Sequence, residues 1–104
     1  MENQTPVYLL ALLLVEDMDS FQSDYVGPLK EINERHGVEA VVATPRLAAI
    51  EGELSENLAA VLRFPSQAAL DAWYADPDYQ PLIAARRDTT SPSLSRLIAL
   101  TPMT

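Results

Sequence analysis

The chain of 104 residues has no cysteine, only three glycines, and seven basic residues against fifteen acidic ones. Without cysteine there is no disulfide framework, no thiolate nucleophile and no cysteine-based metal site. Three glycines are too few for a Gly-rich phosphate-binding loop. A lone histidine is weak support for a metal centre. The formal net charge of −8 disfavours nucleic acids and anionic membranes, whose phosphates would repel the protein. We therefore expect no metal, no cofactor and no nucleic acid.

The longest apolar run, residues 7–15, is too short to cross a membrane. No lysine or arginine precedes this run, and Glu16-Asp17 follows it in place of a small-residue cleavage site. This pattern is not that of a signal peptide. We therefore expect a cytoplasmic protein that has no membrane partner.

Hydrophobic residues make up 48% of the chain, at the upper edge for a soluble protein. The length fits a single domain over residues 1–104, with its core between about 7 and 101. A chain of this size buries roughly 65% of its unfolded surface by itself. The apolar excess therefore favours cover by a second subunit.

Four apolar segments have the length and the abrupt polar boundaries of strands. Residues 47–51 are expected to extend the second strand past a bulge at Pro45, because proline is tolerated at bulges. The four strands are expected over residues 7–15, 38–44, 58–64 and 94–101.

Two regions have helical spacing. Gly37 ends the first, since glycine suits the left-handed position after a helix, and Pro28 is expected to kink it. The break Asp76-Pro77-Asp78 divides the second region. The helices are expected over residues 20–36, 67–75 and 79–88, with caps at Asp19 or Ser20 and at Ser66.

The resulting order β-α-β-β-α-β predicts an α+β fold, a ferredoxin-like antiparallel sheet with its helices on one face. The strands are nevertheless apolar on both faces, and no part of the chain remains to cover the second face. Another copy of the same sheet is the simplest cover, with on the order of 800 Å² buried per subunit. The sequence thus predicts a homodimer, arranged as a dimeric α/β barrel.

The central motif begins at Leu62-Arg63-Phe64-Pro65-Ser66 and continues through Ala72-Trp73-Tyr74, Pro77 and Tyr79-Gln80 to Arg86-Arg87. It resembles the domain-of-unknown-function 1330 family, and the resemblance spans almost the whole chain. It implies the dimeric α/β-barrel superfamily. Relatives in that superfamily include cofactor-free monooxygenases, haem-degrading enzymes and lactone isomerases, so function follows only by analogy of fold.

Three residues are candidates for catalysis: His36, Arg63 and Tyr79. His36, the only histidine, has a reference pKa near neutrality and could act as a general base, although a last-turn residue favourable to the helix dipole is the simpler interpretation. Tyr79 follows the helix break, where it could donate a hydrogen bond or cap a pocket.

Ligand binding is assigned to Arg63, Trp73, Arg86 and Arg96. Arg63 and Arg96 interrupt apolar strands, so each needs either a carboxylate of the protein, which we favour, or an anionic ligand. Trp73 is either core or an apolar pocket wall. Arg86 and Arg87 are most simply surface charges, but Arg86 turned inward could bind a carboxylate substrate bidentately.

Two functions remain open. The first is a cofactor-independent enzyme, monooxygenase-like or isomerase-like, acting on a small organic acid or aromatic compound. The alternative is a non-catalytic ligand-binding or interaction module.

Overall fold

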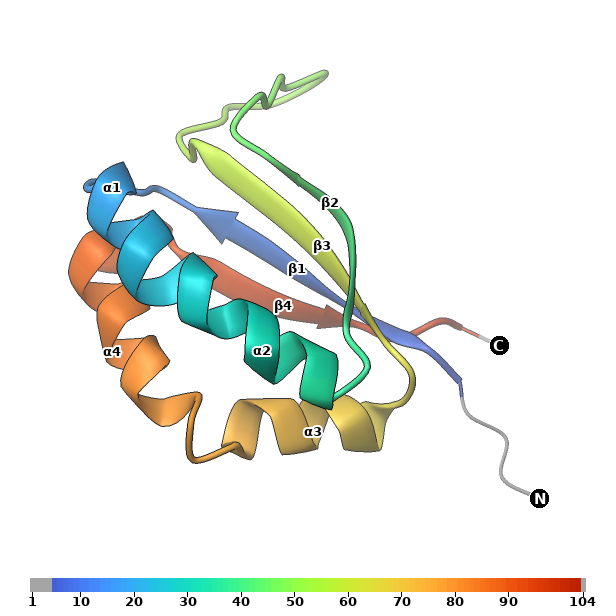
Figure 1. Cartoon of the computed structure of the whole chain (residues 1–104). Helices are drawn as coiled ribbons and strands as arrows, with labels where there is room; N and C mark the ends of the chain where they lie inside the picture. The colour runs from blue at the N-terminus through green and yellow to red at the C-terminus, as the bar shows by residue number, and fades with distance from the viewer. Residues whose placement is uncertain (1–4, 104) are drawn as a thin grey trace.

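Four antiparallel strands form one sheet in the order β2-β3-β1-β4 in the computed structural model, which describes residues 5–103 (Figure 1). The order and pairing are those of the predicted α+β ferredoxin-like sheet. The single-domain prediction also included residues 1–4 and 104, which lie outside the described range. The strands are β1 (Val7–Leu13), β2 (Glu39–Thr44), β3 (Leu58–Phe64) and β4 (Arg96–Leu100).

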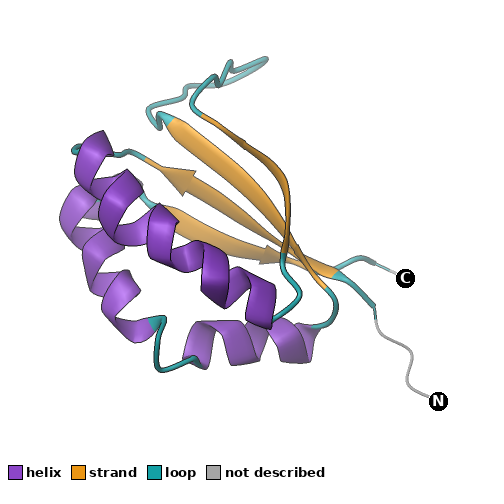
Figure 2. Cartoon of the chain, in the orientation of Figure 1, coloured by secondary structure: helices purple, strands orange, loops and turns teal. Residues whose placement is uncertain are grey.

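The helices all lie on one face of this sheet and leave the other face open (Figure 2). Ser66 caps α3 as expected, because its Oγ accepts a hydrogen bond from the backbone N–H of Ala69 at 3.1 Å. Gly37 follows α2 with φ +69°, the left-handed conformation expected there. The helical elements are α1 (Met18–Phe21), the π-helical turn η1 (Gln22–Val26), α2 (Gly27–Arg35), α3 (Gln67–Ala75), α4 (Gln80–Thr89) and the 3-10 turn η2 (Pro92–Leu94).

The first helical region differs from its prediction at two places. Asp17 is the N-cap, rather than Asp19 or Ser20, and its Oδ1 accepts from the Ser20 N–H at 3.1 Å. The irregularity expected at Pro28 takes the form of η1, just before the proline. Because proline lacks an N–H and crowds the preceding turn, a wider π turn accommodates it without breaking the helix.

The expected continuation of the second strand over residues 47–51 is wrong: this segment is an irregular loop. The bulge lies instead within β2, where the register shifts between Ala40 and Val42. Thr44 already pairs with Ala59, next to the start of β3. Only Leu58 of β3 remains beyond that point, so a longer β2 that includes residues 47–51 has no strand to pair with.

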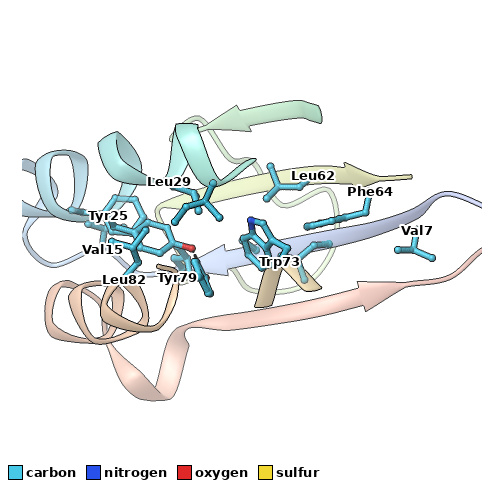
Figure 3. Packing of buried hydrophobic residues seen from close by; sticks show 14 residues of the cluster. Val7, Val15, Tyr25, Leu29, Leu62, Phe64, Trp73, Tyr79 and Leu82 are labelled. Atoms are coloured by element: carbon cyan, nitrogen blue, oxygen red, sulfur yellow. Dashed lines mark hydrogen bonds between the residues drawn. The ribbon is translucent and has the colours of Figure 1, made fainter. Parts of the chain in front are cut away.

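Side chains alternate strictly along β1. Val7, Leu9, Ala11 and Leu13 point towards the helices and are buried, whereas the residues between them face the open side and are half-buried. The aromatic side chains of Trp73, Tyr79 and Phe64 pack with this row into one core between sheet and helices (Figure 3).

Candidate functional site

Two cavities lie between the helices and the sheet, and Trp73 lines both. One, the α2 cleft, has a volume of about 340 Å³ and lies between α2 and strands β1 to β3. The other, the α4 pocket, measures about 520 Å³ and lies between α3, α4 and β4. Leu9 and Leu97 line both cavities as well, so these two side chains and the almost fully buried indole of Trp73 form the wall between two otherwise different environments.

The α2 cleft is lined mainly by apolar side chains of the core, among them Leu9, Leu29, Leu58 and Leu62. Its mouth lies at β2: Ala40 and Ala43 pair with Leu62 and Ala60 on the helix-facing side, yet both alanines are exposed. No helix therefore covers this edge of the sheet, and the cleft opens to solvent there.

Asn33 is the polar group best placed in the α2 cleft, and sequence reasoning missed it. The Trp73 Nε1–H donates to Asn33 Oδ1 at 2.7 Å, so the amide nitrogen of Asn33 is turned away from the indole. That nitrogen makes no hydrogen bond with residues 5–103 and is available as a donor. The signal in the sequence was an amide one turn after Leu29, on an otherwise apolar stripe.

Tyr25 and Tyr79 form a buried pair whose hydroxyl oxygens are 2.8 Å apart. Burial raises the pKa of both phenols above the usual value of 10.0, most strongly for Tyr25. Both side chains are therefore neutral near pH 7. Tyr79 is fully buried and lines neither cavity, and its hydroxyl contacts that of Tyr25, a core residue that also lines the α2 cleft.

His36, at the end of α2, contacts Asp76 instead of a cavity. Its Nε2 lies 2.7 Å from Asp76 Oδ2, and Arg35 Nη1 lies 3.4 Å from the same oxygen. The hydrogen bond from His36, followed by that from the Asp78 backbone N–H, holds the pKa of Asp76 below its usual value. The sequence indicated only a break between helices at Asp76, because His36, which contacts it, lies forty residues earlier in the chain.

Arg63 and Arg96 both lie on the open face of the sheet, opposite the two cavities. Arg63 pairs with Glu39 at 3.7 Å, directly across from it on β2. Arg96 donates to the Glu56 carboxylate. A backbone hydrogen bond and the contact with Arg96 lower the pKa of Glu56. Each arginine thus has a carboxylate of its own chain as partner.

Arg86 is buried in the α4 pocket, with 7% of its surface exposed. The simplest expectation, a surface charge, is therefore wrong for Arg86, although it fits the exposed Arg87. Ser95, which sequence reasoning did not single out, lines the same pocket.

The structure does not bring the three candidate catalytic residues together. His36 is at the end of α2, Arg63 is on the open face and Tyr79 is in the core, and none of them lines the α2 cleft or the α4 pocket. Among residues 5–103, no group of three metal-ligating side chains could hold a metal ion. Of the candidate ligand-binding residues, Trp73 and Arg86 meet in one pocket.

The family follows from residues 6–98, which match the model of Domain of unknown function (DUF1330). The chain belongs to the DUF1330 family. A search of the curated proteins found no match for this DUF1330 protein. In the part of the chain that the structure describes, no helix is long and apolar enough to span a membrane.

Solved structures share the fold of this DUF1330 protein at low sequence identity. A protein of unknown function from Rhodopseudomonas palustris is 19% identical, with a TM-score of 0.80 over 98% of this chain and 85% of that one. A dimeric ferredoxin-like protein of unknown function from Jannaschia is 18% identical, with a TM-score of 0.69 over 93% and 99%. SnoaB, a cofactor-independent oxygenase from Streptomyces nogalater, is 12% identical, with a TM-score of 0.61 over 98% and 96%.

Proposed function

We propose that the chain forms a homodimer through its open sheet face and binds a small, largely apolar organic molecule in the α2 cleft. The proposal of ligand binding rests on the size and lining of the cleft. Protein cores are close-packed, so a solvent-connected space of about 340 Å³ bounded by core leucines is a ligand site by size and lining. The donor nitrogen of Asn33 would orient a carbonyl or hydroxyl oxygen of the ligand.

The open sheet face supports the dimer. Arg63–Glu39 lies near one end of this face and Arg96–Glu56 near the other, so a polar rim flanks an apolar centre, as in protein interfaces. The dimeric ferredoxin-like relative from Jannaschia also favours a second copy as the occupant. The apolar centre comprises Tyr8, Leu10, Leu12, Val42, Ala59, Val61, Ile98 and Leu100.

Light scattering at micromolar concentration tests the dimer. The wild type is expected at twice the mass of the chain, and Val61→Glu at the mass of one chain, because a carboxylate would be buried unpaired at the interface. Ala48→Glu, in the exposed loop after β2, is the matched control and stays dimeric. A monomeric wild type contradicts the dimer and leaves the proposal for the α2 cleft intact.

Two functions of the protein are compatible with a bound molecule in the cleft. A cofactor-independent enzyme, oxygenase-like or isomerase-like, is supported by likeness of fold to SnoaB. A non-catalytic binding module is favoured by a different observation: His36, Arg63 and Arg96 are all engaged by carboxylates of the chain, away from the cleft. Oxygen uptake with a dihydroxynaphthalene separates an oxygenase from the binding module, since only the oxygenase consumes oxygen, and it would lose this activity in Ala43→Trp.

Thermal shift and calorimetry with neutral probes, indole and 1-naphthol, test binding in the α2 cleft. We expect both to raise the melting temperature of the wild type. Ala43→Trp should abolish this effect, because the added indole fills the mouth of the cleft, whereas Ala48→Trp should preserve it. Equal binding to both variants, or no binding of either probe to the wild type, would refute the proposal.

A further inference from the structure

We propose that the α4 pocket is a second site, which binds a small organic carboxylate with an apolar body through Arg86. The pocket is separate from the α2 cleft, with Trp73 between them, so the proposal does not depend on the function proposed for that cleft. The proposal starts from a buried cation that has no ion-pair partner among residues 5–103.

Arg86 differs from every other basic side chain of the protein. Among residues 5–103, Arg35, Arg63 and Arg96 pair with carboxylates, and the remaining basic side chains apart from Arg86 are exposed to water. Arg86 is buried, and no described carboxylate lies within 4.0 Å of its guanidinium. Taking a charge out of water without a counter-ion is strongly unfavourable. In a chain with fifteen acidic residues, the missing partner points to an anion from outside.

The polar atoms around the pocket are also unused. Arg86 Nε and Ser95 Oγ are both fully shielded from solvent and have no hydrogen-bond partner among residues 5–103. Both residues line the same cavity. Buried polar groups are normally satisfied, so two unsatisfied donors on residues that line one cavity support a recognition site there.

The chemistry of these donors favours a carboxylate. The two Nη atoms of an arginine carry N–H groups that match the two oxygens of a carboxylate, and the Ser95 side chain lies on the same lining. The apolar part of the lining includes Leu9, Leu70, Trp73, Tyr74 and Leu97, which suit an apolar or aromatic body. Arg87 also lines the pocket but is exposed to water, so Arg86 is its one buried cation, and a monoanion such as benzoate is a suitable probe.

Isothermal calorimetry with sodium benzoate, and with benzamide as its neutral analogue of the same shape, tests the site. We expect benzoate to bind the wild type, and benzamide to bind at least about tenfold more weakly, because hydrogen bonds to a charged group are worth that much. Arg86→Met should weaken benzoate binding by the same factor. Arg46→Met, an exposed arginine in the loop after β2, should bind like the wild type.

Two further measurements keep the test decisive. The Nε–H signal of Arg86 in a nitrogen-15 spectrum of the wild type should shift on titration with benzoate and stay unchanged with benzamide, even if Arg86→Met fails to fold. Benzoate should also bind Ala43→Trp, which blocks only the α2 cleft. No benzoate binding by the wild type, equal binding of benzamide, or full binding by a folded Arg86→Met would overturn the proposal.

Discussion

His36 Nε2 lies 2.7 Å from Asp76 Oδ2 and joins the end of α2 to the turn between α3 and α4. Both side chains are largely buried, at 18% and 8% exposed. The contact crosses forty residues of sequence. The residue that first suggested a general base thus has a definite structural partner.

This pair predicts a loss of stability in acid. The pKa of Asp76 is lowered in the folded state, chiefly by its hydrogen bond with His36, so the folded protein favours the ionised form. Its contribution is therefore complete above the unfolded value, near 3.8, and is lost as pH falls through the lower folded value. We expect Asp76→Asn to lower the melting temperature at pH 7 and to have a smaller effect at pH 2. Glu53→Gln, exposed in the loop before β3, should change the melting temperature at neither pH. Equal losses for Asp76→Asn at both pH values would contradict the linkage.

The hydrogen bond between Trp73 and Asn33 predicts the cost of removing the indole nitrogen. Trp73→Phe leaves the Asn33 Oδ1 unpaired and should cost about 1–3 kcal/mol in the free energy of unfolding, before any loss of packing. Urea unfolding followed by circular dichroism measures this, since the variant has no tryptophan fluorescence. The neighbouring Tyr74→Phe removes a hydroxyl without a hydrogen-bond partner among residues 5–103 and should cost less than about 0.5 kcal/mol. A Trp73→Phe variant no less stable than Tyr74→Phe would show that the hydrogen bond does not stabilise the fold.

The buried tyrosine pair predicts non-additive mutations. Tyr25→Phe or Tyr79→Phe alone leaves the other hydroxyl unsatisfied, and each should cost about 1–3 kcal/mol. The double variant removes both polar groups and should cost less than the sum of the two. A double-mutant cycle by urea unfolding measures the coupling, and simple additivity would argue against the bond.

The same pair predicts a loss of stability in alkali. Because the folded pKa values of Tyr25 and Tyr79 are raised, their contribution is complete below about pH 10, the unfolded value, and declines as pH rises above it. Unfolding measurements between pH 9 and 11 should show a steeper decline for the wild type than for the double Phe variant. Parallel declines would mean that other groups control alkaline stability.

Two glycines should respond to alanine with opposite signs. Gly37 has φ +69°, and an added Cβ would lie 3.2 Å from Pro65 Cγ, so Gly37→Ala should cost about 1–2 kcal/mol. Gly27 is helical, and its added Cβ would make only an ordinary contact at 3.5 Å. Gly27→Ala should therefore stabilise by about 0.4–1 kcal/mol through the unfolded state. Melting temperatures test both signs, and a stabilising Gly37→Ala would contradict the strain described.

Local pattern was sufficient for most of the fold. The strands and the helix at 67–75 follow from short-range periodicity, and the Ser66 cap and Gly37 act within one turn of their own helices. The failure at residues 47–51 comes from pairing between distant segments, because these residues have strand-like composition but β3 offers them no partner. The π turn before Pro28 is instead a local response to the proline.

By itself, the sequence determined the family, the β-α-β-β-α-β order and the two-sided apolar strands, because each depends on residue type and spacing along the chain. Only the tertiary structure decided which polar groups are satisfied. Arg63 and Arg96 find Glu39 and Glu56, His36 finds Asp76, and Asn33 finds Trp73, each on another element. Arg86 and Arg87 have almost the same sequence neighbourhood, but the orientation of α4 against the sheet buries Arg86 and exposes Arg87. Arg86 has no carboxylate partner among the described residues.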